Sequence, residues 1–227
     1  NVDIIGFHGQ TIFHNPEKKF TKQLGDGRLL SQLSKKEVVY DFRKNDLING
    51  GQGAPLTPIF HNVLANKIHK AYNLEFPINI LNIGGISNVT TTVNENDLDY
   101  VSKIYAYDIG PGNCLIDDWI RKNSRKNFDQ DGLIARSGKT DDLILNQALE
   151  NFASKFDYNK SLDIKDFDIF FAKVFSLENG AATITNFTAE LIAEGIRYVE
   201  NKIKTNKSNW LVCGGGRKNK YLLESIE

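Results

Sequence analysis

The sequence predicts a mixed α/β fold, and three features of its C-terminal part carry this prediction. Three β-type runs follow one another as a meander and lead into an amphipathic helix. A second, longer amphipathic stretch precedes a short apolar strand, and a glycine triplet turns that strand into a last helix. Strand–strand–strand–helix followed by helix–strand–helix is the element order of a ribonuclease H-like unit.

The elements of this unit are placed by their apolar spacing and by the breaks between them. Pro77 marks a break before the unit. The meander strands are expected at residues 78–83, 88–93 and 100–107, joined by Gly84-Gly85 and by a polar connection at 94–99. The helices are expected at residues 114–122, 181–204 and 220–227, and the fourth strand, of a buried type, at residues 210–213.

The N-terminal part is predicted to hold two strands, a glycine-rich loop and one helix. Residues 2–7 and 37–42 have β-type composition, and the polar segment 43–46 follows the second run. Residues 49–55 are too rich in glycine for regular structure. A helix is expected over residues 58–72, and its apolar residues at helical spacing are Phe60, Val63, Leu64 and Ile68.

The composition excludes several classes of partner. The 28 basic and 28 acidic residues give a net charge of zero, which argues against nucleic acid or an anionic membrane as the main partner. No apolar run approaches the roughly 20 residues that span a bilayer, and the first residues do not form a signal peptide. The chain has no methionine, starts within a strand-type run and stops within a helix-type run, so we expect a fragment of a longer protein.

The two cysteines, Cys114 and Cys213, are expected to be reduced, buried thiols rather than a disulfide, because they lie far apart among apolar residues and glycines. Leu115 and Ile116 follow Cys114 on the apolar side of a helix, so core packing explains this residue better than nucleophilic catalysis. No Gly-x-Ser-x-Gly motif is present, so a serine hydrolase has no support.

The most informative motif surrounds Asp108, which is expected to end a strand. Gly110, Gly112 and Asn113 follow it, and a helix begins directly after them. Such a turn lets backbone N–H groups approach an anion, and the positive end of the helix faces the same place. A carboxylate beside a phosphate-binding turn indicates phosphoryl transfer, although Gly-Pro-Gly turns also occur as plain structural punctuation.

Two further glycine clusters stand at strand ends and support a nucleotide site. They are Gly84 with Gly85, and Gly214, Gly215 and Gly216. Three such clusters in one unit indicate backbone cleared for a nucleotide. Neither the P-loop pattern nor the dinucleotide fingerprint fits any of them, so the implied nucleotide fold is neither of those two common types.

Two polar groups in the N-terminal part are candidate ligand-binding residues. His8 and Gln10 lie at a strand end, with His14 six residues after His8, a spacing that does not match a helical zinc pair. This group fits either a binding edge for a hydroxylated ligand or a capped turn. Arg43, Asp46 and Gln52 fit a sugar carrying a carboxylate, because arginine binds carboxylates bidentately. They fit a surface ion pair in a solvated loop equally well.

These loops together resemble the anhydro-N-acetylmuramic acid kinases, sugar kinases of the actin/hexokinase/heat-shock ATPase superfamily. The resemblance covers nearly the whole chain. It rests on His8-Gly9-Gln10-Thr11 with His14 and Pro16, Asp41-Phe42-Arg43 with Asp46, residues 50–56, residues 82–88, residues 108–113 with Leu115, Asp117 and Trp119, residues 160–163, residues 181–183, and Gly214-Gly215-Gly216 with Asn219.

The resemblance implies an ATP- and magnesium-dependent kinase that opens the 1,6-anhydro bridge of a muramic acid sugar and phosphorylates O6. Asp108 would be the base that activates a water, and Arg43 would meet the lactyl carboxylate of the sugar. The implied sugar-binding residues are His8, Gln10, Arg43, Asp46, Gln52 and Asn88. The implied ATP-binding residues are Gly84, Gly85, Gly110, Gly112, Asn113, Gly214, Gly215, Gly216 and Asn219, and no protein metal ligand is assigned.

The implied architecture is an actin-like ATPase fold of two ribonuclease H-like lobes with the active cleft between them. Residues 1–76 would be an incomplete first lobe and residues 77–227 most of the second. A phosphate loop would precede this chain and further sequence would follow it, and Lys44 stands where the family usually has arginine. A cytoplasmic enzyme of cell-wall recycling, with a homodimer among its expected states, is the first hypothesis. The alternatives are a non-catalytic sugar- or nucleotide-binding fragment, or a related kinase for another sugar.

Overall fold

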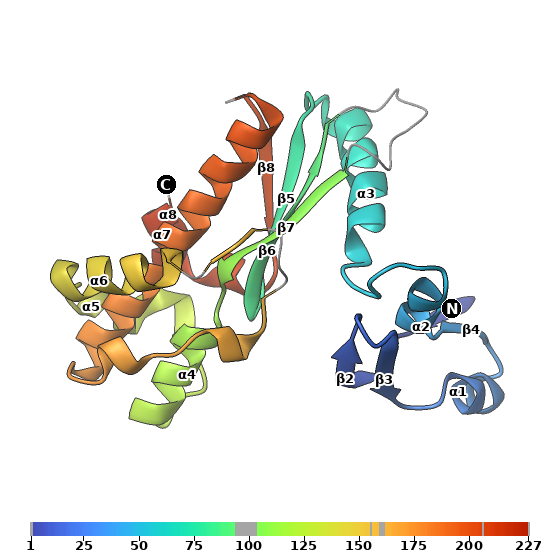
Figure 1. Ribbon diagram of the computed structural model, residues 1–227, viewed down its shortest axis with the longest axis horizontal. Helices are drawn as coiled ribbons and strands as arrows, with labels where there is room; N and C mark the ends of the chain where they lie inside the picture. Colours follow the sequence, from blue (N-terminus) through green and yellow to red (C-terminus); the bar gives the residue numbers. More distant parts are fainter. Residues whose placement is uncertain (1, 94–103, 155, 159–161, 206, 227) are drawn as a thin grey trace. The chain divides into compact units, whose positions relative to one another are not determined.

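The computed structural model describes residues 2–93, 104–154, 156–158, 162–205 and 207–226. The predicted 94–99 connection and the first four residues of the strand predicted at 100–107 lie outside them. The chain divides into two compact units, Asn1–Thr57 and Pro58–Glu227 (Figure 1), and each is described by itself. The lobe boundary expected near residue 76 stays a prediction.

The N-terminal unit contains two small sheets and two helices. β1 (Ile4–Phe7) pairs in parallel with β4 (Glu37–Tyr40), and β2 (Gln10–Asn15) pairs in antiparallel fashion with β3 (Phe20–Leu24). The helices are α1 (Gly27–Ser34) and α2 (Phe42–Ile48). The two predicted strands and the irregular 49–55 loop are confirmed.

The structure corrects one expected strand bound in this unit and excludes two alternatives that the sequence left open. The second strand ends at Tyr40, because Asp41 adopts the left-handed conformation with φ 59°, and residues 43–46 lie on α2 rather than in a solvated loop. Residues 10–15 form a strand of the β2–β3 hairpin, not a capped turn. The hairpin went unpredicted because its exposed strands lack a buried apolar face.

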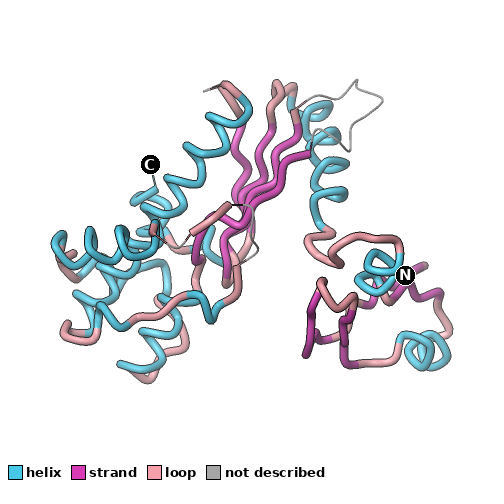
Figure 2. Tube along the Cα trace, in the orientation of Figure 1, coloured by secondary structure: helices cyan, strands magenta, loops and turns pink. Residues whose placement is uncertain are grey.

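The C-terminal unit is built on a four-stranded sheet with the order β7-β6-β5-β8 (Figure 2). Its strands are β5 (Ile78–Ile83), β6 (Ile86–Thr92), β7 (Ile104–Pro111) and β8 (Asn209–Cys213). β5, β6 and β7 form the predicted antiparallel meander, and β8 pairs in parallel with β5. The third strand was expected to end near Asp108, but β7 continues to Pro111 because residues 110 and 111 still pair with β6. The strand predicted as buried, β8, is only half-buried, and Val212 is 38% exposed.

The helices of this unit are α3 (Thr57–Tyr72), α4 (Cys114–Asn123), α5 (Leu133–Ser137), α6 (Asp142–Ala153), α7 (Leu177–Ile203) and α8 (Lys220–Ile226). The helices predicted at 58–72, 114–122, 181–204 and 220–227 are therefore confirmed to within a few residues. Among the described residues, no helix is both long and apolar enough to cross a membrane.

Helices α7 and α3 cover opposite faces of the sheet (Figure 1). On the α7 side the Tyr107 ring meets Tyr198 edge-on, and Gly195 lets α7 approach Ile109 so closely that an added Cβ would collide with it. On the other side His61 of α3 is hydrogen-bonded to Thr90 of β6 at 2.8 Å. Asp108 lies between Tyr107 and Ile109, so its side chain projects from the α3 face of the sheet.

The main core lies between the sheet and helices α4 and α7. Its fully buried members include Ile83, Ile109, Ile116, Ile120, Ile184 and Ile192. Helix α3 packs differently, because Asn62 and Ala65 are buried while Phe60 is 63% exposed. The apolar spacing therefore identified this helix correctly, but most of its large apolar residues do not form its buried side.

Candidate functional site

A row of polar side chains crosses the sheet near the end where the glycine turns lie. The strand register pairs Asp108 of β7 with Asn88 of β6, and Asn88 with Asn82 of β5. The same register pairs Asn82 with Cys213 of β8. Directly paired residues in neighbouring strands point to the same face. The sheet therefore brings together Asp108 and Asn88, two residues that the sequence analysis assigned to the site. It also places Asn82 beside them, a residue to which the sequence analysis gave no role.

Asp108 is held in a half-buried position by one backbone contact. Its Oδ2 accepts a hydrogen bond of 2.9 Å from the N–H of Leu162. Burial raises the pKa of this carboxyl, and the hydrogen bond from Leu162 opposes part of that rise. A carboxylate with a raised pKa is the better proton acceptor, as a general base requires. The contact from Leu162 left no signal in the sequence, because it comes from a distant main-chain atom.

The first two glycine turns are joined by their main chains. The N–H of Gly112 donates to the Gly85 carbonyl at 2.9 Å, and the N–H of Asn113 donates to the Gly84 carbonyl at 2.7 Å. The Asn113 side-chain amide also donates to the Gly84 carbonyl at 3.1 Å. The first helical residue of α4, Cys114, follows at once, so the positive end of α4 lies at this edge.

The glycines at this edge fall into two classes. At Gly112 and Gly216 an added Cβ would collide with Gly84 and Ile83, and at Gly214 it would lie 2.5 Å from the Ile83 carbonyl oxygen. These three glycines are needed for the turns to pack together. At Gly85 and Gly215 the nearest atoms lie 3.9 and 3.7 Å from an added Cβ. The packing of the turns therefore does not require glycine at these two positions. Their lack of a side chain leaves the surface of the turns open.

Three of the predicted nucleotide residues have structural contacts of their own. Gly110 was expected in a turn, but it lies within β7. Its φ of 153° accompanies an irregularity in the β6–β7 register. Asn113 precedes α4 without capping it and turns its amide toward Gly84. Asn219 is buried, and its amide oxygen accepts the Leu222 N–H of α8 at 3.0 Å. Their contacts with a nucleotide stay predictions.

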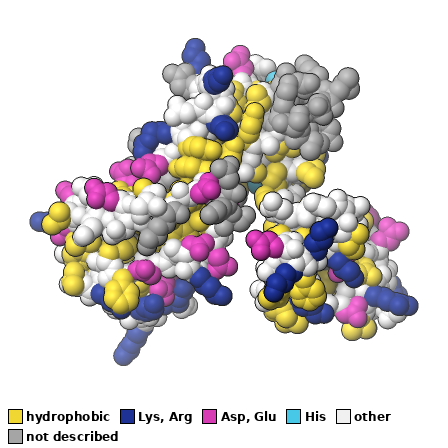
Figure 3. Space-filling model, in the orientation of Figure 1, with side chains coloured by type: hydrophobic (Ala, Val, Ile, Leu, Met, Phe, Trp, Pro, Cys, Tyr) yellow, Lys and Arg dark blue, Asp and Glu magenta, His cyan; other side chains and the backbone are white. Residues whose placement is uncertain are grey.

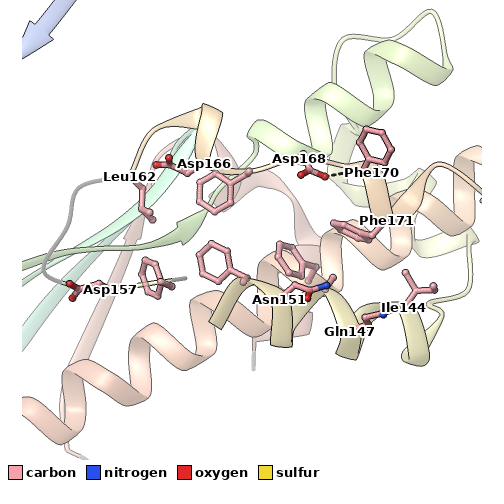
Figure 4. Close-up of a pocket in the computed structure, with 14 residues that line it drawn as sticks. Ile144, Gln147, Asn151, Asp157, Leu162, Asp166, Asp168, Phe170 and Phe171 are labelled. Atoms are coloured by element: carbon pink, nitrogen blue, oxygen red, sulfur yellow. Dashed lines mark hydrogen bonds between the residues drawn. The ribbon is translucent and has the colours of Figure 1, made fainter. Parts of the chain in front are cut away.

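A cavity of about 750 Å³ lies beside this site, between α6 and the segment 162–171 (Figure 4). Its walls include stacked phenylalanines: Phe152 lies parallel to Phe167 with ring centroids 5.5 Å apart, and it also stacks on Phe156. Leu162 lines the same cavity while its N–H holds Asp108. The aromatic wall therefore supports the segment that positions the carboxylate.

Two contacts in the N-terminal unit involve three of its five predicted ligand-binding residues: His8, Arg43 and Asp46. Arg43 Nε donates to His8 Nε2 at 3.1 Å, and His8 Nδ1 lies 2.9 Å from the Gly9 carbonyl oxygen. Both contacts are satisfied by one neutral tautomer, with the proton on Nδ1. This arrangement fixes one edge of the Arg43 guanidinium and leaves its other N–H groups for an anion.

The second contact forms the glycine-rich loop. Asp46 Oδ2 accepts the Gly53 N–H at 2.7 Å, and the Gly51 N–H donates to the Asp46 carbonyl at 2.9 Å. Asp46 thus shapes the loop that presents the exposed Gln52, instead of pairing with Arg43 as a surface ion pair. Gln10 lies exposed at the start of β2, and no further contact links it to this loop among the described residues.

His14 contributes to the same loop, although the sequence gave it no role beyond the resemblance. Its Nδ1 lies 3.2 Å from Thr21 Oγ1, and Gly53 packs against its ring. Burial lowers the pKa of His14, the positive charge of Arg43 lowers it further, and a hydrogen bond to the Gln52 backbone opposes both. His8 and His14 therefore serve separate contacts, and no group of three metal-binding side chains gathers in the described parts of the chain.

Both thiols are free, as predicted. Cys114 is buried in the core, as predicted, but Cys213 is only half-buried. Burial raises the pKa of each thiol. A raised thiol pKa disfavours the reactive thiolate. Neither residue has the character of a nucleophile.

Comparison with known proteins connects both groups of residues to one family. A protein-family model described as anhydro-N-acetylmuramic acid kinase matches residues 1–227. The anhydro-N-acetylmuramic acid kinase of Pelagibacter ubique (strain HTCC1062) is 50% identical over 227 residues, covering 100% of this chain and 58% of that protein. Those of Rhodopseudomonas palustris (strain ATCC BAA-98 / CGA009) and Agrobacterium fabrum (strain C58 / ATCC 33970) are 39% and 38% identical over 226 residues, covering 100% of this chain and 58% and 57% of those proteins. The chain thus spans somewhat more than half the length of these curated relatives.

Proposed function

The chain belongs to the anhydro-N-acetylmuramic acid kinase family, and from this premise we propose that its protein hydrolyses the 1,6-anhydro bridge of anhydro-N-acetylmuramic acid and phosphorylates O6 with ATP. The product would be N-acetylmuramic acid 6-phosphate. The observation that carries the proposal is the half-buried Asp108 carboxylate, whose pKa is raised, next to the glycine turns at the N-terminus of α4.

The proposed reaction assigns one proton transfer to Asp108. Its carboxylate takes a proton from a water molecule, and the water oxygen forms a bond to the anomeric carbon while the bond from that carbon to O6 breaks. The freed O6 then attacks the γ-phosphorus of ATP, and ADP departs. The Leu162 N–H supports this role by fixing Oδ2 of the carboxylate, which leaves Oδ1 to take the proton.

The N-terminal unit supplies groups that suit the sugar. Arg43, anchored by His8, would bind the lactyl carboxylate through its remaining N–H groups. Gln52 would present its amide to hydroxyl or acetamido groups from the loop that Asp46 and His14 hold in place. Asn88 would contact the sugar beside Asp108, its partner across the β6–β7 pair.

The glycine turns suit the phosphates of ATP. Gly85 and Gly215 leave the surface open, and the positive end of α4 favours negative charge at this edge. Magnesium, when bound with ATP, would neutralise the phosphate charge. Magnesium bound with a nucleotide commonly takes most of its oxygens from the phosphates and water, and we propose the same here.

The decisive experiment measures ADP release by the full-length gene product with magnesium-ATP and 1,6-anhydro-N-acetylmuramic acid. Sugar-dependent ADP release is expected, and Asp108→Asn should reduce it by about 10² to 10⁴-fold, since the amide cannot take a proton. Near-normal turnover in this variant would remove Asp108 from the mechanism. A sugar that raises the melting temperature without ADP release would indicate a binding protein instead.

We further propose a cytoplasmic role in recycling cell-wall sugars, and a homodimer as the working state. Faster turnover with N-acetylglucosamine than with the anhydro-sugar would contradict the substrate and favour a related sugar kinase. Light scattering after size-exclusion chromatography would test the dimer.

A further inference from the structure

The main-chain N–H that holds Asp108 stands at the entrance of a short turn. Leu162 donates to Asp108 Oδ2 at 2.9 Å, and the next N–H along the chain, that of Asp163, donates to Asp166 Oδ2 at 2.7 Å. The residues Ile164–Asp166 form a single 3-10 turn directly after Asp163. Two successive main-chain N–H groups are therefore each held by the carboxylate of an aspartate.

Asp163 closes the same turn from its other end. Its Oδ1 accepts the Lys165 N–H at 3.0 Å, and its carbonyl oxygen accepts the Asp166 N–H at 2.9 Å. Together with the bond from the Asp163 N–H to the Asp166 carboxylate, these contacts make a capping box. Because the N–H of Asp163 belongs to the peptide group that follows Leu162, the box sets the direction of the chain at Leu162.

The far end of the turn is anchored on α6. The N–H of Phe167 donates to the Ile164 carbonyl at 3.3 Å, and the Phe167 ring lies parallel to Phe152 of α6, with an interplanar angle of 13°. Leu162 and Asp166 lie at one end of the cavity, while Asp168 is nearer Phe170 (Figure 4). The turn thus links the wall of the cavity to the carboxylate on the sheet.

Asp163 and Asp166 are both exposed, so their carboxylates act on the turn and not on the core. We propose that Asp166 is a positioning residue for the reaction: through the capping box it holds Leu162 where its N–H meets Asp108. Asp166 acts only through the main chain of residues 162 and 163. This inference rests on the proposed function in taking Asp108 as the base.

Three variants of the full-length gene product separate the acceptor oxygen of Asp166 from its charge. Asp166→Ala removes both, whereas Asp166→Asn removes the charge and keeps an oxygen that can accept the Asp163 N–H. Asp168→Ala is the matched control. Asp168 is also an exposed aspartate on the cavity, and its Oδ1 accepts the Phe170 N–H at 2.8 Å, a bond outside the turn that leads to Asp108.

The first measurement is sugar-dependent ADP release. Asp166→Ala should lower kcat by about 3- to 10-fold, as expected for the loss of one capping contact that supports the base. The KM for the anhydro-sugar should stay within about twofold, because the binding groups are untouched. Asp166→Asn and Asp168→Ala should both turn over within about 1.5-fold of the wild type, as exposed substitutions that keep the box intact.

The pH profile of kcat/KM gives a direction that a general structural defect would not produce. In the described part of the chain, burial raises the pKa of Asp108, the Leu162 N–H lowers it, and no charged neighbour contributes. Weakening the bond from Leu162 should therefore move the acid limb of the Asp166→Ala profile to higher pH. A direct effect of the lost negative charge would move it to lower pH, and Asp166→Asn would then show the same movement.

Hydrogen exchange at the Leu162 amide tests the positioning without any turnover. Exchange should accelerate in Asp166→Ala and stay at the wild-type rate in Asp166→Asn and Asp168→Ala. The amides within α6 should exchange at the wild-type rate in all three variants, which shows that the change is confined to the turn.

The outcomes separate this inference from the proposed reaction. Turnover at the wild-type rate by Asp166→Ala overturns the positioning role even in an active kinase, and equal losses in Asp166→Ala and Asp166→Asn overturn the role of the acceptor oxygen. Unchanged exchange at Leu162 in Asp166→Ala overturns the hold of Asp166 on Leu162. A wild-type protein without sugar-dependent ADP release overturns the proposed function, while faster Leu162 exchange in Asp166→Ala would still support that hold.

Discussion

The two units of the chain use their apolar side chains in different ways. In the C-terminal unit, isoleucines from the sheet, α4 and α7 form a continuous core. In the N-terminal unit, Leu47 is buried at 2% exposure, but many other large apolar side chains lie on the surface (Figure 3). The exposed ones are Val2, Ile4, Ile12, Phe13, Phe20, Leu24, Leu29, Leu33, Val39, Tyr40, Phe42 and Ile48.

This difference shows which unit is stabilised by its own packing. Parallel strands such as β1 and β4 are normally covered on both faces, and a two-stranded sheet alone is marginal in water. The C-terminal unit has a long helix against each face of a four-stranded sheet. We therefore expect the C-terminal unit to be the more stable one. The proposed sugar-binding groups of the N-terminal unit should be held by local hydrogen bonds more than by a core.

The largest expected effect is at Trp119 in the C-terminal core. This side chain is 2% exposed, its indole N–H donates to the Leu177 carbonyl at 2.9 Å, and Gly180 packs against its ring. Trp119→Ala should lower the free energy of unfolding by about 3–5 kcal/mol in urea titrations. Phe13→Ala, at a side chain 47% exposed in β2, is the aromatic control and should cost about 1 kcal/mol or less. Equal losses would remove the distinction between the units.

A leucine pair sharpens the comparison within the N-terminal unit. Leu47 is 2% exposed on α2, whereas Leu33 is 75% exposed on α1. Leu47→Ala should cost about 2–4 kcal/mol and Leu33→Ala about 0.5 kcal/mol or less, measured by thermal and urea unfolding. If Leu47→Ala lowered the free energy of unfolding as little as Leu33→Ala does, the N-terminal unit would not have a stabilising core of its own.

A smaller effect is expected at the loop held by Asp46. Asp46→Ala removes the acceptor of the Gly53 N–H and should cost about 1–2 kcal/mol. Hydrogen exchange at the Gly53 amide should accelerate, while exchange in β5 stays unchanged. Asp46→Asn keeps an oxygen in place and serves as the control. Unchanged protection of Gly53 in the alanine variant would show that the loop does not depend on Asp46.

The smallest effect concerns pH and Asp108. Because burial raises the pKa of this carboxyl, the folded protein holds its proton more tightly than the unfolded chain does. Stability from this group is therefore lost as pH rises from the unfolded-chain value, about 3.9, through the raised pKa of the folded state. Asp108→Asn should melt slightly above the wild type near neutral pH, and this advantage should disappear in acid. If Asp108→Asn melted below the wild type at every pH, the predicted destabilisation by the charged Asp108 carboxylate would be wrong.

Much of the C-terminal unit could be predicted from the sequence. The apolar run 78–83 and the regular apolar spacing of 181–204 each indicated one element, and the structure has both. The glycine clusters at residues 84–85 and 214–216 were also expected at strand ends, and they directly follow β5 and β8. These features are local or follow from strand order, so periodicity and turn residues are enough to find them.

The N-terminal unit was harder to predict because its elements carry weak patterns. The left-handed Asp41 ends β4 and starts α2 without glycine or proline to mark the place. The β2–β3 hairpin turns at Lys19, again a non-glycine residue with positive φ. The contacts of Leu162 with Asp108 and of His8 with Arg43 join residues far apart in the chain. Such pairings depend on tertiary structure and cannot be read from local sequence.

The main-chain hydrogen bonds between the first two glycine turns limit which sequence changes this edge of the sheet can accept during evolution. Because Gly112 and Asn113 reach Gly85 and Gly84 through N–H and carbonyl groups, substitutions at neighbours such as Ile86 leave the bonds intact. An insertion or deletion of a single residue in either turn would shift both bonds out of register at once. The edge can therefore tolerate drift in its side chains but not a change in the length of its loops.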